Sequence, residues 1–239
     1  MRGDQHVSLS LATAGLFIAP WVTVLDPVLS AVLLFGVFVG SHAAIFNGRI
    51  GGMKGKRGQA LNGVAVVLPI FGYTIRYLIY YPLSLIFSLL LRKSYQHRHR
   101  GLLHSFSGVG LTSLILSGYL ALILTWLGWP LALLPAFGGA FFAGCVLHLM
   151  EDTCTPAGVA WLYPFSRRRM AGRVRTQGDF EVRPVAFTIV LVSAAAGLLI
   201  TPFVTPVPLE ALRLLALVGT PLLWLLFMLI CRAKPQCRR

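Results

Sequence analysis

Long apolar segments joined by short polar connections dominate the sequence. Six of them are long enough to cross roughly 30 Å of hydrocarbon as helices, namely about 7–25, 27–46, 103–127, 131–150, 185–202 and 208–231. A further apolar stretch, 61–91, lies between the second and the third. The pattern predicts an all-α polytopic membrane helix bundle.

The basic residues determine how 61–91 is expected to lie. Apart from Arg76 and Arg213, all Lys and Arg fall at the two termini, in clusters on both sides of 61–91, and in the segment 159–184. Such residues collect in cytoplasmic loops, so both flanks of 61–91 are expected on the cytoplasmic side. Because the stretch carries Arg76 and contains helix-breaking Pro and Gly, we expect a re-entrant or in-plane segment. A full hairpin is the alternative.

This topology gives six crossings of a cell inner (plasma) membrane, with both termini cytoplasmic. We expect one transmembrane domain over 1–239, whose site-bearing core covers about 1–165. An Arg-rich cytoplasmic loop would follow at 159–184 and a C-terminal helix pair at 185–231.

Composition agrees with a membrane protein. Hydrophobic residues make up 56% of the 239 residues and charged residues only 12%, about half the share in a soluble domain. The formal charge of +14 is explained by basic loops, so we expect membrane lipids as partners and no specific nucleic acid. The four cysteines form no CxxC pair, which argues against a zinc site built on them.

One helix end carries the clearest candidate chemistry. His148 and Asp152 are four residues apart, so they share one helix face. Thr155-Pro156 then ends the helix, because proline disfavours helix in the residue before it. Imidazole and carboxylate at this spacing predict two ligands of a divalent metal ion. The alternative is a histidine that caps the helix end beside an aspartate that is solvated or paired with an arginine.

The predicted topology brings the other histidines to the same membrane face. His6 precedes the first helix, His42 lies near the cytoplasmic end of the second, and His97, His99 and His104 precede the third. We expect His99, His104 and His6 to complete a metal site with His148 and Asp152, and His97 to be a solvated loop residue. The alternatives are a polar helix start capped by Ser105 and histidines that are buried or interfacial without a ligand role.

Two further residues are candidates for catalysis. Arg100 could bind an anionic substrate oxygen or face lipid phosphates. Glu151 is a candidate general base, although it points about 100° away from Asp152 on a helix and is more simply a solvated neighbour. Zinc is the first choice of cofactor, with manganese or iron as alternatives, since such an ion activates water near neutral pH.

Two motifs resemble a known family. They are His99-Arg-Gly-Leu-Leu-His104-Ser105 and Gly144-x-x-x-His148-x-x-x-Asp152-x-x-Thr155-Pro156-x-Gly158 with Leu162-Tyr-Pro164. They resemble the YdjM-like family of inner-membrane proteins, described as membrane-bound metal-dependent hydrolases. The resemblance covers about 1–185, including His6 and Gly178 to Glu181. It implies that His99, His104, His148 and Asp152 belong to a site for a divalent metal.

The chain departs from this family at one place. Members usually carry Pro-Asp-x-Asp-His at the cytoplasmic end of the second helix, whereas this chain has Val39-Gly-Ser-His42-Ala-Ala44. Two expected carboxylate ligands are therefore absent, and His42 is a partial substitute at best.

Three functions remain open on the sequence. The first is metal-dependent hydrolysis of an ester or phosphoester, including one in a lipid, at the cytoplasmic face. The second is a non-catalytic membrane protein that kept the bundle and lost part of the metal site. The third is a metal or small-solute transporter.

Overall fold

The computed structural model describes residues 3–46, 104–175 and 181–236, and also 77–78, 81–82, 85–86 and 89. Within the ranges 3–46, 104–175 and 181–236 there are six α-helices, one short 3-10 helix (η1, Ala19–Trp21) and two short strands. The helices are α1 (Gly3–Ile18), α2 (Pro27–Phe46), α5 (Phe106–Trp126), α6 (Leu134–Thr153), α7 (Val182–Val204) and α8 (Leu209–Ile230). The described residues are mostly helical, as the sequence predicts.

Four of these helices, α5, α6, α7 and α8, are long and apolar enough to cross a membrane. In α2 the apolar stretch with described side chains, Pro27–His42, is shorter. The membrane class therefore stands, while the count of six crossings stays a prediction. Most of the stretch 61–91 lies outside the described residues, so its predicted re-entrant course is untested.

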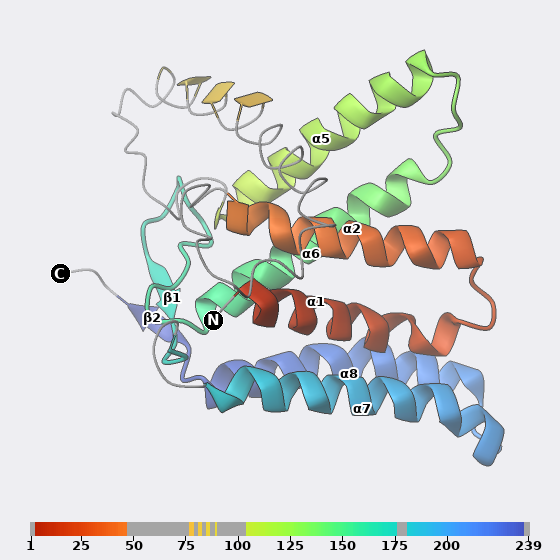
Figure 1. Ribbon diagram of the computed structural model, residues 1–239. Helices are drawn as coiled ribbons and strands as arrows, with labels where there is room; N and C mark the ends of the chain where they lie inside the picture. The colour runs from red at the N-terminus through yellow and green to blue at the C-terminus, as the bar shows by residue number, and fades with distance from the viewer. Residues whose placement is uncertain are drawn as a thin grey trace, which may run out of the picture.

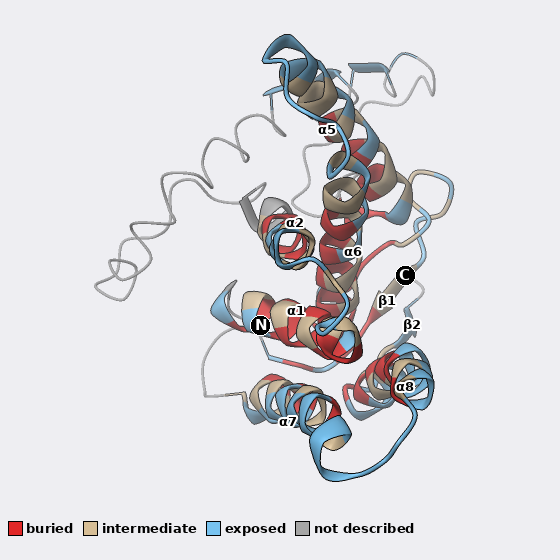
Figure 2. Ribbon diagram, turned by 90° about the vertical axis from the view of Figure 1, so that its right-hand side faces the viewer, coloured by how far each residue is buried: buried red, intermediate tan, exposed pale blue. Residues whose placement is uncertain are grey.

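The helices run between two ends of one bundle. The N-terminal end of α1, the β-sheet and the C-terminal end of α6 lie at one end, which we call the site end (Figure 1). The connections α1–α2, α5–α6 and α7–α8 lie at the opposite end (Figure 1). Viewed from that opposite end, α1 lies between the α7–α8 pair and the α2–α6 pair (Figure 2). Helix α1 contacts all four of these helices.

Helices α2 and α6 approach so closely that their backbones meet. A Cβ on Gly40 would lie 2.2 Å from the Phe141 carbonyl oxygen, and one on Gly144 would lie 2.3 Å from that of Val37. The Cys145 thiol donates to the Gly40 carbonyl across this contact (3.2 Å). Small residues allow such contact between membrane helices. The contact at Gly40 and Gly144 fixes the position of α6 along α2.

A turn and a small sheet hold the end of α6. Gly158 has a φ of +59°, and a Cβ there would meet the Met170 carbonyl oxygen at 2.4 Å. Strand β1 (Arg169–Ala171) pairs antiparallel with β2 (Lys234–Gln236). The C-terminal segment is thereby tied to the segment that follows α6. Neither strand was predicted, because three residues are too few to show an alternating pattern.

Substitution of Gly144 by alanine should destabilise the fold, because the new methyl group would collide with backbone rather than with a movable side chain. We expect G144A to lose about 1–3 kcal/mol of stability. Its control is G139A on the same helix, where a Cβ meets nothing within 4 Å. Thermal unfolding in detergent should show a lower Tm for G144A alone, and equal values would contradict the close contact.

Candidate metal centre

Three polar residues at the end of α6 are almost completely buried. Glu151 has no exposed surface, and His148 and Asp152 are each 3% exposed. Two adjacent carboxylates in such surroundings are costly unless they are hydrogen-bonded or neutralised by a cation. Their partners come from elements far away in the sequence.

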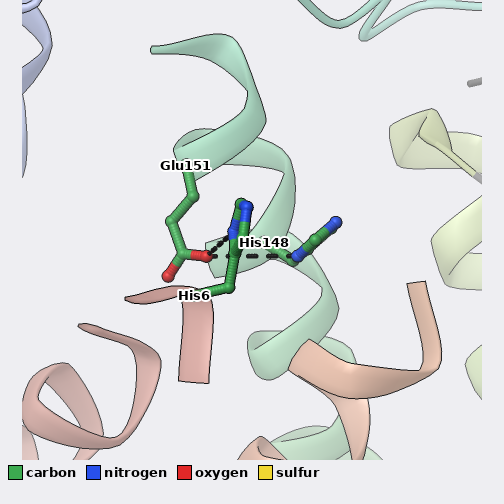
Figure 3. Close-up of side chains that lie close together, drawn as sticks. All are labelled: His6, His148 and Glu151. Atoms are coloured by element: carbon green, nitrogen blue, oxygen red, sulfur yellow. Dashed lines mark hydrogen bonds and ion pairs between the residues drawn. The ribbon is translucent and has the colours of Figure 1, made fainter. Parts of the chain in front are cut away.

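Helix α1 supplies two partners to Glu151. His6 Nδ1 lies 2.5 Å from Glu151 Oε2, and Ser10 Oγ donates to Glu151 Oε1 at 2.9 Å. His6 and Ser10 are four residues apart, so they share one face of α1. Figure 3 shows the Glu151 carboxylate directed at His6, with His148 beside them. The His148 Nδ1 atom is 4.0 Å from Glu151 Oε2.

His104 reaches the cluster from the turn before α5. Ser105 is the N-cap of α5, and its hydroxyl accepts from the Gly108 amide. The Phe106 amide donates to the Trp161 carbonyl, and the Ser107 hydroxyl donates to the backbone carbonyl of Tyr163. The start of α5 is thus attached to the segment after α6. Ser105 caps the helix, as the alternative interpretation has it, while His104 is 3% exposed and lies beside Asp152. The ligand role of His104 stays a prediction.

Three imidazole nitrogens surround the Asp152 carboxylate. His148 Nε2 and His104 Nε2 lie 3.7 Å and 3.9 Å from Oδ2, and His6 Nε2 lies 4.0 Å from Oδ1. A hydrogen bond would require about 2.7–3.2 Å. Two ligands held ~2.1 Å from one tetrahedral ion are roughly 3.4 Å apart. The spacing is thus too long for direct hydrogen bonds and close to the spacing of ligands around a metal ion.

The donor set suits a divalent metal. His104, His148 and Asp152 offer ligand atoms within 4.8 Å of one another, and so do His6, His148 and Glu151. Neutral imidazoles and carboxylates bind zinc, manganese or iron. In the second group, however, the short His6–Glu151 contact is a hydrogen bond, so those two atoms do not face each other across an ion. The better-spaced site is the one around Asp152.

The predicted site residues fall into three sets. His6, His104, His148 and Asp152 come together. His42 is half-buried, lies 3.0 Å from the Phe38 carbonyl through Nδ1, and belongs to neither of the two ligand groups found among the described residues. The predicted ligand His99 and the predicted anion-binding residue Arg100 lie outside the described residues, as does His97.

The sequence interpretation of Glu151 as a solvated neighbour was wrong. Helix geometry does turn it away from Asp152, but that direction faces α1 rather than solvent. Ser10 was missed entirely. The available signal was its spacing of four residues from His6, and a serine in an apolar helix gives too weak a pattern to stand out.

The Arg-rich segment 159–184 makes hydrogen bonds at the site end of the bundle. Arg169 donates through Nη1 to the Ala157 carbonyl in the turn after α6 (3.1 Å), while Arg167 and Arg168 are exposed.

Arg183 donates to both carboxylate oxygens of Glu181 at 2.8 Å and to the Arg173 carbonyl. Hydrogen bonding from Arg183 lowers the pKa of Glu181 to about 2.

Fold and site together define a helical membrane protein with a buried histidine–carboxylate cluster at one end of its bundle. The chain belongs to the YdjM inner membrane protein family, whose model matches residues 1–233. The match extends beyond the motifs that carry the resemblance and includes the C-terminal helix pair. No curated protein and no solved structure matches the chain.

The Glu181 ion pair should make stability depend on pH. Because the pKa of Glu181 is lowered in the folded protein, its contribution is present above the ordinary value of 4.5. That contribution is lost as the pH falls from 4.5 towards 2. We expect E181Q to cost roughly 1–2 kcal/mol at pH 7 and to differ less from wild type in acid.

Thermal unfolding at a series of pH values measures this difference. The control is E210Q, because the Glu210 side chain is 80% exposed and should contribute little. A difference between E181Q and wild type that stayed constant down to the lowest pH would contradict the lowered pKa of Glu181.

Proposed function

We propose that the protein is a membrane-bound metal-dependent hydrolase of an ester or phosphoester. One observation carries the proposal: three imidazole Nε2 atoms lie 3.7–4.0 Å from one buried carboxylate. That arrangement has the donor types and the spacing of a metal centre, and membership of the family supports it.

Asp152, His104 and His148 are the residues that would hold the metal, with His6 beside them. The sequence proposes His99 as a further ligand. Zinc is the first choice because imidazoles and a single carboxylate suit it, and manganese or iron are alternatives. When bound, such an ion supplies a water molecule of lowered pKa, which is a nucleophile near neutral pH.

The chain's own residues would bind and orient the substrate. Exposed Arg167 and Arg168 lie on the segment that follows α6, and the sequence adds Arg100 before His104. Guanidinium groups suit a phosphate or carboxylate oxygen. The basic residues at this end indicate the cytoplasmic side of the inner membrane, and the end of a membrane helix lies near the lipid headgroups. A lipid ester or phosphoester therefore fits the location best.

A second candidate is a membrane protein that binds metal without catalysis. It is favoured by the end of α2, where Val39 and Ser41 are buried and 39–44 holds no carboxylate. The two candidates share the metal centre and differ in turnover, so one experiment tests the centre and another the reaction.

Metal content tests the centre. The wild-type protein, purified in detergent without chelators, should contain about one equivalent of zinc, manganese or iron by elemental analysis. H148A and D152A should lose it, because each removes a ligand from the same face of α6. H42A is the control, since His42 lies outside both ligand groups, and it should keep the metal. A metal-free wild type, or full metal content in D152A, would overturn the centre.

Turnover separates the two candidates. Metal-loaded wild type should hydrolyse a chromogenic phosphodiester or a phospholipid in mixed micelles, and D152A should be slower by at least about 100-fold, since metal activation of water supplies several kcal/mol. The phospholipid should be preferred if the site acts at headgroup depth. A wild type that binds metal stoichiometrically but turns over no ester or phosphoester would favour the non-catalytic candidate.

A further inference from the structure

Glu151 is the buried acid of the cluster that the metal centre around Asp152 does not use. It has no exposed surface, and both of its oxygens have partners on α1. Oε1 accepts from Ser10 at 2.9 Å and Oε2 lies 2.5 Å from His6 Nδ1. A carboxylate held at both oxygens is poorly placed to take a proton from a substrate, so a general-base role is not supported by the geometry.

The two nitrogens of His6 have different surroundings. Nδ1 makes the short contact with Glu151, whereas Nε2 is 4.0 Å from Asp152 Oδ1. An imidazole that donates its Nδ1–H to a carboxylate leaves its Nε2 lone pair available. Histidines that bind metals are commonly oriented by such a contact, which fixes both the tautomer and the direction of the ring.

We propose that Ser10 and Glu151 form a positioning pair that holds His6 as a metal ligand through Nε2. Ser10 fixes the Glu151 carboxylate, Glu151 accepts Nδ1–H of His6, and His6 Nε2 is then directed towards Asp152. His6 thereby joins His104 and His148 as the third imidazole. This inference rests on the metal centre proposed above and is independent of whether the centre hydrolyses anything.

A purely structural role would make a different prediction. If the His6–Glu151 contact served only to join α1 to α6, its loss would lower Tm and leave the metal affinity of the folded protein unchanged. The positioning role predicts weaker metal binding in protein that is still folded. The affinity of folded protein therefore distinguishes the two roles.

Zinc affinity of the full-length protein in detergent tests the proposal, measured by competition with a chelating dye at one pH. We expect E151Q to bind zinc about 10–100-fold more weakly than wild type, and S10A to show a smaller loss in the same direction. S8A is the control, because the Ser8 hydroxyl donates to the Gln5 carbonyl and Ser8 is exposed. The S8A variant should bind zinc as wild type does.

Unchanged affinity in E151Q would overturn the proposal. Complete loss of zinc, as in D152A, would also overturn it and would make Glu151 a ligand.

The tautomer of His6 provides a readout that needs no metal. In metal-free protein with isotope-labelled histidine, nitrogen NMR should show His6 protonated on Nδ1, with the signal assigned by its loss in H6Q. A His6 protonated on Nε2 would overturn the proposal even if zinc binds. If wild type binds no metal, the proposed hydrolase function fails, and the tautomer alone decides whether Glu151 orients His6.

Discussion

The adjacent burial of Glu151 and Asp152 is the constraint on which the site end depends. Neither carboxylate is solvated, so each must find donors or a cation within the protein. Helix α1 meets this need for Glu151 through Ser10 and His6. Imidazoles from three separate elements surround Asp152 at distances close to those between ligands of one ion. Packing α1 and the start of α5 against α6 therefore assembles the cluster as well as the bundle.

Different elements of the bundle supply different groups of the histidine–carboxylate cluster. Helix α6 supplies both carboxylates and one imidazole, α1 supplies an imidazole and a hydroxyl, and the turn before α5 supplies another imidazole. In the part of the chain that the structure describes, α2 adds no ligand to these groups. Helix α2 contributes the close backbone contact at Gly40 and Gly144. This contact holds α6, the helix that carries both carboxylates, in place. The α7–α8 pair supports the other side of α1, where Trp224 donates to Thr13.

Much of this arrangement could be read from the sequence, and the exceptions have physical reasons. The spacing of His148 and Asp152 fixes their shared face whatever the surroundings are. The basic loops predict that the other histidines lie at the same end, and of these His6 and His104 do lie near the pair. The direction of Glu151 was not predictable in this way, because it depends on which helix packs against that face of α6 and on how that helix is rotated. Neighbours of this kind are properties of the assembled bundle, and periodicity within one helix does not contain them.

The glycine contact between α2 and α6 limits how the sequence can change in length. Gly144, His148 and Asp152 follow one another at intervals of four residues, so the same face of α6 carries the contact and then the ligands. Inserting one residue between Gly144 and His148 would rotate both ligands by about 100° relative to α2, while the glycine contact stayed in register. The interval from Gly144 to Asp152 is therefore fixed in length. Chains that keep the glycine contact should tolerate no insertion or deletion between Gly144 and Asp152. This holds even where each apolar residue of that interval can be replaced by another apolar residue.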